Sequence, residues 1–203
     1  MKLYYSPGAC SLSPHIVLHE SGLTFEAIQA STKTKKLADG TDYLSINPKG
    51  QVPMLELDNG ERLSEGPAIV QWIADQVPDK KLVPAWGTLA RYRAMEWLNF
   101  ITSELHKGFT PLFTPGMPDE AKAIYRDRLI ARFTWIDQEL QGRDYLLGAD
   151  FSVADAYLFT VAGWGKYVGV DLSDLATLQA YLGRVMARPA VQAAMRAEGL
   201  IKS

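Results

Sequence analysis

The only cysteine of the chain, Cys10, lies in the segment MKLYYSPGACSLSPH. It stands between a strand predicted at residues 2–6 and a helix predicted to end near Ser21. The N-terminus of a helix has unpaired N–H groups and a partial positive charge, which stabilise a thiolate. Because an ordinary thiol has a pKa of about 8.5, only about 3% of it is ionised at pH 7. The position therefore suits a reactive thiolate, although a small residue packed under a turn is the alternative.

Cys10 begins the sequence CSLS, which has the spacing of a thiol–disulfide exchange motif, with Ser13 in place of the second cysteine. A mixed disulfide at Cys10 would find no second thiol in the chain to resolve it. The spacing therefore favours pairing with a small external thiol over disulfide shuttling. A single cysteine is also typical of a reducing compartment, so we expect the protein in the cytoplasm.

Two further segments suggest a site for an amino-acid derivative. In QVPML, a cis Val52–Pro53 bond would turn the backbone N–H and C=O of Val52 outward, as an edge for an extended peptide. In SEGPA, Gly66 leaves the N–H groups of a helix start open to a carboxylate, and Glu65 offers a negative charge to an ammonium group. An α-amino acid head group needs both a partner for its carboxylate and a negative charge for its ammonium group. A turn proline and an ordinary helix start are the alternatives.

A polar stripe of Asn99, Ser103 and His106 recurs at i, i+4 and i+7 on a helix predicted over residues 88–108. Such a stripe is ordinarily solvated surface. His106 lies near the helix end, where cations are favoured, and is a candidate hydrogen-bond donor to a sulfur near neutral pH. Aromatic candidates for an apolar pocket, with core packing as their alternative, are Phe109, Phe113, Trp164 and Tyr167.

The elements that must position these residues fall into two domains. Residues 1–79 alternate strands and helices in the order βαβαββα, with a hairpin turn at the sequence DNG. PDKKLVPAW predicts a linker at residues 80–86. From residue 87 to 203, apolar residues recur at helical spacing on several segments, which predicts one shared helical core. Ser152 and Asp155 form a capping box that starts one of these helices.

Composition excludes several classes of function. The formal net charge of −2 provides no basic surface for nucleic acid. Since no run approaches 18 apolar residues, we expect no membrane-spanning helix, and the first residues lack the charge pattern of a signal peptide. The sequence contains no metal-ligand motif, and we expect no metal.

Three features together resemble the glutathione site of a cytosolic glutathione transferase. They are a thiol after the first strand, Val-Pro before the third strand and Glu-Gly at the third helix. Five segments closely resemble the bacterial beta class of this family, which has a cysteine at the position of Cys10. These segments are PGACSLSPH, NPKGQVP, EGPAIVQWIAD, WLNFITSELHKGF and FSVADAYLF. The resemblance covers nearly all of the chain. It implies a thioredoxin-like N-terminal α/β domain and an all-α C-terminal domain that borders the site of the electrophile.

The resemblance implies that a homodimer conjugates the thiolate of its co-substrate, glutathione, to small, often hydrophobic electrophiles in detoxification. The peptide would bind as an added strand against Val52, with its γ-glutamyl group at Glu65 and its glycyl carboxylate at Lys35. Cys10 would lie beside the bound sulfur, and His106 would assist. The positions that match glutathione contacts in the family are Cys10, Lys35, Val52, Pro53, Glu65, Gly66, Asn99, Ser103, Glu104, Leu105 and His106.

Two alternative functions remain open at this point. Cys10 would hold glutathione as a mixed disulfide in a thiol transferase or reductase, and a non-catalytic ligand-binding protein would use the same fold. Retention of Cys10, Val52, Glu65 and His106 together argues against a non-catalytic protein. One position departs from many transferases, because Gly66 stands where a hydroxyl would contact the γ-glutamyl carboxylate. The sequence does not identify the electrophile.

Overall fold

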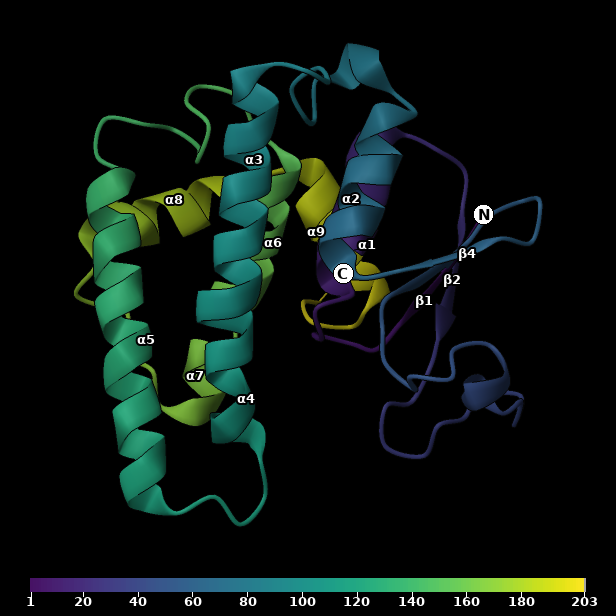
Figure 1. Cartoon of the computed structure of the whole chain (residues 1–203), viewed down its shortest axis with the longest axis horizontal. Helices are drawn as coiled ribbons and strands as arrows, with labels where there is room; N and C mark the ends of the chain where they lie inside the picture. Colours follow the sequence, from purple (N-terminus) through teal and green to yellow (C-terminus); the bar gives the residue numbers. More distant parts are fainter. Residues whose placement is uncertain (203) are drawn as a thin grey trace. The chain divides into compact units, whose positions relative to one another are not determined.

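The computed structural model describes residues 1–202, which form two units (Figure 1). One unit comprises Met1–Val83 together with the chain from Arg188 onward, and the other comprises Pro84–Ala187. The predicted domains differ in one respect, because they assigned everything after residue 86 to the helical domain. The last helix, α9 (Pro189–Ala197), packs instead against α1 (Leu12–Ser21) in the first unit. Helical periodicity predicts an apolar face but does not say which domain that face covers.

The first unit is built on a four-stranded mixed sheet in the order β2-β1-β3-β4. β1 pairs in parallel with β2, and the pairs β1–β3 and β3–β4 are antiparallel. The strands are β1 (Lys2–Tyr5), β2 (Glu26–Gln29), β3 (Met54–Glu56) and β4 (Arg62–Ser64). The predicted order of elements is confirmed, except that the second helix is a single 3₁₀ turn, η1 (Tyr43–Ser45).

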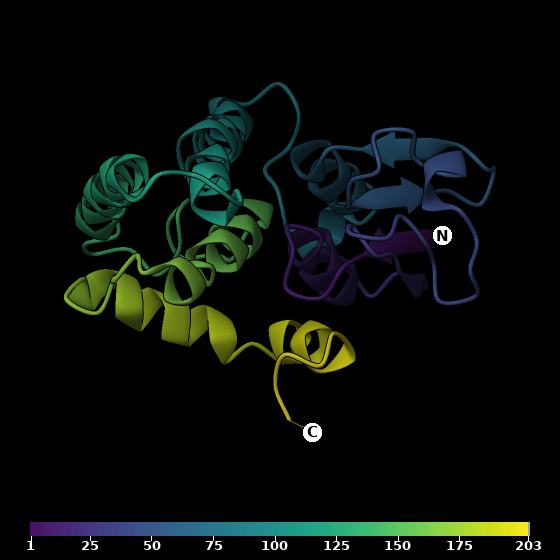
Figure 2. The ribbon, with the colours of Figure 1, turned by 90° about the horizontal axis from the view of Figure 1, so that it is seen from below.

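Side chains cover both faces of this sheet. Tyr4 and Met54 are paired across β1 and β3 and belong to a buried cluster with Ala30, Tyr43 and Val52. Successive side chains of a strand point to opposite faces, so the neighbouring buried pair, Leu3 and Leu55, lies on the other face. On that face α1 and α2 (Gly66–Asp75) pack on each other and on the strands (Figure 2). Val52 therefore packs on the face of the sheet that carries Tyr4 and Met54, and α1 packs on the opposite face.

The second unit, residues 84–187, consists of helices joined by loops, with one isolated bridge between Tyr145 and Gly148. Its central helix is α6, whose ten residues are all buried and around which α3, α5 and α8 lie (Figure 2). Its elements are α3 (Leu89–Phe100), η3 (Ile101–His106), α4 (Lys107–Phe113), α5 (Asp119–Glu139), α6 (Val153–Ala162), α7 (Gly165–Val168) and α8 (Ala176–Met186). The 3₁₀ turn η2 (Pro78–Lys80) belongs to the first unit.

The helix predicted over residues 88–108 has the expected start but a different interior. Its middle, η3, is π-helical, and the helix continues through α4 to Phe113. A π-helical turn holds more residues than an α-helical turn, and such segments occur frequently at functional sites. Periodicity alone did not predict it, because the buried residues Ile101 and Leu105 keep an ordinary i, i+4 spacing.

The predicted capping box at the start of α6 is present. The buried carboxylate of Asp155 accepts hydrogen bonds from the Ser152 N–H at 2.8 Å, the Leu146 N–H at 2.9 Å and the Tyr181 hydroxyl at 2.9 Å. Asp155 thus joins three segments of the helical core, a structural role. Across residues 1–202, none of the helices combines the length and apolar character that crossing a membrane requires.

Candidate functional site

A short loop, residues 6–10, connects β1 to α1 and carries the cysteine; we call it the thiol loop. Ser11 closes it, because its Oγ accepts from the Ser6 N–H at 3.1 Å and donates to the Ser6 carbonyl at 3.2 Å. The Ala9 N–H also donates to the Ser6 carbonyl, at 3.0 Å. Cys10 is half-buried directly before α1, at the predicted strand–helix junction.

The thiol of Cys10 contacts the segment that precedes β3. Its Sγ donates to the carbonyl oxygen of Val52 at 3.2 Å, and the Val52–Pro53 peptide bond is cis. Within residues 1–202 the N–H of Val52 has no hydrogen-bond partner. The backbone of Val52 therefore presents an unpaired donor beside the thiol, as the edge of a strand does.

A buried tyrosine holds this segment in place. The hydroxyl of Tyr43 donates to the carbonyl oxygen of Gln51 at 2.8 Å, and Nδ2 of Asn47 donates to the same oxygen at 2.7 Å. Burial, the largest effect, raises the pKa of Tyr43 to about 12, although the hydrogen bond with Asn47 opposes this shift. The phenol is therefore neutral at physiological pH and able to donate.

Lys35 lies against the same segment. Its Nζ donates to the carbonyl oxygen of Gly50 at 2.7 Å. A Cβ at Gly50, whose φ is +61°, would lie 3.0 Å from Leu44 and 3.2 Å from the Lys35 side chain. The absence of a Cβ at Gly50 thus leaves room for the Lys35 side chain to pass over this residue. The ammonium group of Lys35 therefore lies at Gly50, two residues before Val52.

The start of α2 carries an unusual backbone conformation. Glu65 precedes the helix at a φ of 72°, in the left-handed region that side chains other than glycine rarely adopt. Such strained positions occur preferentially at functional sites. Ser64 is the last residue of β4, so the strand continues to the turn at Glu65. Gly66 is the first residue of α2, as the glycine–helix pattern predicted.

Lys49 is a neighbour of Glu65 that sequence reasoning missed. Its Nζ lies 2.8 Å from Oε1 of Glu65 and donates to Oγ of Ser64 at 3.2 Å. Both charged side chains are exposed, so the contribution of this ion pair to stability is small. The sequence shows Lys49 in NPKG, 16 residues before Glu65. Only the folded hairpin brings this lysine near Glu65.

In the helical unit, His106 is the last residue of η3 and is half-buried. Its Nδ1 lies 2.6 Å from the hydroxyl of Tyr157, a contact that sequence reasoning did not predict. Its ring is 4.9 Å from that of Trp164, which also stands in edge contact with Phe109 and Phe113. These rings form an aromatic cluster around His106.

The aromatic candidates are not equivalent. Phe109 is completely buried and packs on Phe133, so it belongs to the helical core. Half of Phe113 is exposed, and it forms the open side of the cluster. Tyr167 is exposed and contacts the ammonium group of Lys166, with no ring contact to the cluster among residues 84–187.

The remaining candidates on η3 and α3 differ in their accessibility. Asn99 and Ser103 are exposed, whereas the side chain of Leu105 is completely buried. Oε2 of Glu104 accepts from Arg132 at 2.9 Å and from Arg128 at 3.0 Å. These two hydrogen bonds hold the pKa of Glu104 below its usual range. Glu104 therefore joins η3 to α5.

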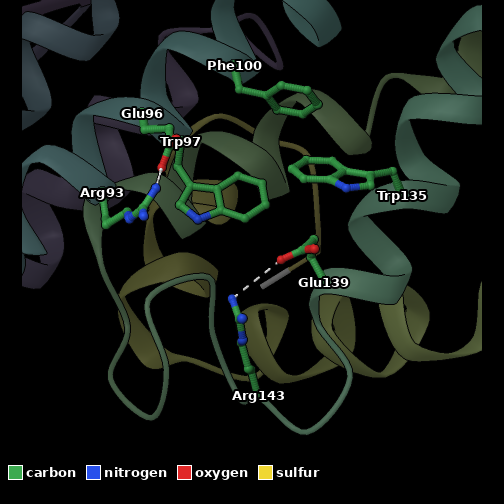
Figure 3. A pocket seen from close by; sticks show the side chains of 7 residues that line it. All are labelled: Arg93, Glu96, Trp97, Phe100, Trp135, Glu139 and Arg143. Atoms are coloured by element: carbon green, nitrogen blue, oxygen red, sulfur yellow. Dashed lines mark hydrogen bonds and ion pairs between the residues drawn. The ribbon is translucent and has the colours of Figure 1, made fainter.

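A groove of about 510 Å³ lies between α3 and α5 (Figure 3). The rings of Trp97, Phe100 and Trp135 form its wall, with centroids 4.9 to 6.0 Å apart. Two ion pairs lie beside them, Arg93 with Glu96 at 2.7 Å and Arg143 with Glu139 at 3.8 Å. No group of His, Cys, Asp and Glu side chains within residues 1–202 is arranged to hold a metal ion.

Comparisons with known proteins identify the family. Family models described as the N-terminal and C-terminal domains of glutathione S-transferase match residues 8–76 and 100–189. The chain is 47% identical to glutathione S-transferase GstA of Escherichia coli O157:H7, over 98% of this chain and all of that protein. The chain belongs to the glutathione S-transferase family.

Solved structures of glutathione S-transferases are similar to the whole chain. A bacterial beta class enzyme of Sphingomonas chungbukensis has 50% identity and a TM-score of 0.96 over 99% of this chain and all of that chain. A sphingomonad glutathione S-transferase complexed with glutathione has 50% identity and a TM-score of 0.95, with the same coverage of both chains. These comparisons confirm the predicted family and its fold.

We predict that Tyr43→Phe destabilises this glutathione S-transferase by about 1 kcal/mol at pH 8, the typical value of a buried hydrogen bond. In the wild type, the phenol of Tyr43 keeps its proton in the folded state up to a pH of about 12, whereas in the unfolded state it loses the proton near pH 10. The contribution of Tyr43 to stability is therefore complete below pH 10 and lost as the pH rises to 12.

Urea unfolding of both proteins at several pH values measures this difference. The stability advantage of the wild type over Tyr43→Phe should shrink between pH 10 and 12. An advantage that stays constant over this range would contradict the role assigned to the buried phenol.

Proposed function

We propose that this chain conjugates glutathione to small electrophiles and that the thiol loop and the Val52–Pro53 segment form its glutathione site. The enzyme is a glutathione transferase with glutathione as co-substrate, as its relatives are. The observation that carries the assignment of the site is the 3.2 Å contact between Cys10 Sγ and the Val52 carbonyl. It brings the start of a helix, which favours an anionic sulfur, beside a backbone edge that suits an extended peptide.

The charges around this edge fit the two ends of a γ-glutamyl tripeptide. The carboxylate of Glu65 suits the α-ammonium group, and the N–H groups at Gly66 suit the adjacent carboxylate. The ammonium group of Lys35 lies at Gly50 and suits the glycyl carboxylate at the other end. Lys49, now paired with Glu65, offers a second cation for the carboxylate groups of the peptide.

In this proposal His106 assists the bound sulfur. We assign His106 the tautomer in which Nδ1 accepts from the hydroxyl of Tyr157, 2.6 Å away, and Nε2 carries the proton. We assign Nε2 as the donor to sulfur. Phe113 and Trp164 then offer apolar surface to the electrophile, and Asn99 and Ser103 offer polar contacts. Arg128 and Arg132 keep Glu104 in place on the same segment.

The proposal also covers the cellular location of the enzyme and its oligomeric state. We place the enzyme in the cytoplasm, because its single cysteine is typical of a reducing compartment. We also propose a homodimer that buries the groove between α3 and α5. Trp135 in this groove is 41% exposed, and both signs of charge flank it, so the same patch on a second copy is complementary to it.

We expect Glu65→Gln to raise the Kd for glutathione about 10- to 100-fold, because a charge-assisted hydrogen bond contributes about 1.5 to 3 kcal/mol. Isothermal titration calorimetry measures the affinity, and turnover with a panel of aryl halides, epoxides and disulfides measures the activity. Glu61→Gln, an exposed carboxylate of the hairpin in the same unit, is the matched control and should change Kd less than twofold. A wild type that neither binds nor turns over glutathione would refute the proposed function, and an unchanged Kd in Glu65→Gln would refute the assigned site.

We expect Trp135→Glu to convert the enzyme from dimer to monomer at micromolar concentration, since a charge in the aromatic groove prevents its burial against a second copy. Size-exclusion chromatography with light scattering measures the mass. Ile124→Glu places the same charge on another exposed apolar residue of α5 and should stay dimeric. A monomeric wild type, or a Trp135→Glu variant that remains dimeric, would show that the groove is not the interface.

A further inference from the structure

A buried carboxylate from the end of the chain contacts the thiol loop. Oε2 of Glu198 accepts from the Gly8 N–H at 2.8 Å, and Oε1 lies 2.8 Å from Nδ1 of His15 on α1. The side chains of Glu198 and His15 are almost completely inaccessible to solvent. Glu198 therefore connects the loop before Cys10 to the helix after it.

The position of this carboxylate is unfavourable for its own helix. Glu198 lies at the C-terminal end of α9, where the helix dipole disfavours a negative charge. Burial adds a desolvation cost, which only hydrogen-bond donors offset. Those donors are the thiol loop and α1, so the carboxylate stabilises these two segments rather than α9.

A second contact from the same segment fixes the loop. Gly8 has a φ of +70°, which glycine adopts without strain, and the place of its missing Cβ lies 3.4 Å from Cδ2 of Leu200. The ring of His15 is held in turn by the rings of Tyr5, His19 and Phe25, all at centroid distances below 6 Å. Both partners of Glu198, Gly8 and His15, are thus packed against neighbouring side chains.

We propose that Glu198 is a positioning residue for the glutathione site. It holds Gly8 and the start of α1 in the geometry that places Cys10 Sγ against the Val52 carbonyl. This inference rests on the proposed function, because it assumes that glutathione binds at Val52. The segment after residue 188 therefore shapes the site without contacting the co-substrate.

The chain provides a matched control in the same helix–helix contact. Arg188 binds Glu20 through Nε at 2.6 Å and Nη2 at 2.9 Å, and so also ties the last segment to α1. This ion pair does not touch the thiol loop. A purely structural role of Glu198 would make Glu198→Ala and Glu20→Ala behave alike.

The experiment compares both variants with the wild type in three measurements. These are the Tm, the KM for glutathione, and the rate at which iodoacetamide alkylates Cys10, the only cysteine, followed by intact-protein mass spectrometry. We expect both variants to lower the Tm. Only Glu198→Ala should raise KM at least fivefold and speed alkylation at least threefold, because the released loop frees the thiol. Glu20→Ala should stay within twofold of the wild type in both.

Two conservative variants complete the design. Glu198→Gln keeps an acceptor for Gly8 and offers its NH2 group to His15, whose neutral ring can accept at Nδ1 in its other tautomer. This variant should restore KM and alkylation to within twofold of the wild type. Glu198→Asp is one methylene too short to reach both partners and, if Glu198→Ala does not fold, takes its place with the same expected direction. The inference is overturned if Glu198→Ala and Glu20→Ala shift only the Tm, or shift KM and alkylation equally. Failure of the proposed function can be distinguished from failure of this inference. If the wild type did not turn over glutathione, the alkylation rate of Cys10 would still show whether Glu198 holds the thiol loop.

Discussion

The contact of the Cys10 thiol with the carbonyl of Val52 joins two segments that are 42 residues apart. The sheet makes it possible, because β1 delivers the thiol loop and β3 begins directly after Val52. Three further contacts of the first unit support these two segments. Ser11 closes the loop, Glu198 holds Gly8, and Tyr43 holds Gln51. The two segments are therefore held by partly buried hydrogen bonds, whose polar groups are costly to leave unsatisfied.

The helical unit contributes a different kind of chemistry. Its π-helical segment ends at His106, whose Nδ1 is engaged by Tyr157. Aromatic rings surround the imidazole on the side of Trp164. The first unit thus offers charges and backbone groups, whereas the second presents the imidazole of His106 among aromatic rings.

Local patterns predicted the parts of this structure that local physics determines. The strand–helix junction at Cys10, the glycine at the start of α2 and the capping box of Asp155 each follow from neighbouring residues. The segment NPKGQVP predicted a turn at Pro53. The resemblance of these segments to the beta class extended the prediction to the whole fold, and the comparisons confirmed the family.

What the sequence did not predict depends on contacts between distant residues. Lys49 meets Glu65, Tyr157 meets His106 and Glu198 meets Gly8 only after the chain folds. The packing of the last helix on α1 was not predicted either, because helical periodicity does not say which domain an apolar face covers. The π-helical turn left no periodic signal, since its buried residues keep an α-helical spacing.

The central claim is that the site stabilises the bound glutathione sulfur as a thiolate, and ultraviolet titration of the Cys10→Ala variant saturated with glutathione tests it most directly. In this variant the protein contains no thiol, so thiolate absorbance near 240 nm arises only from the co-substrate. The account predicts that the bound sulfur is ionised at pH 7 and that the variant still conjugates glutathione. A bound sulfur that stays protonated above pH 8.5, with conjugation lost, would contradict the account and favour a mixed-disulfide mechanism at Cys10.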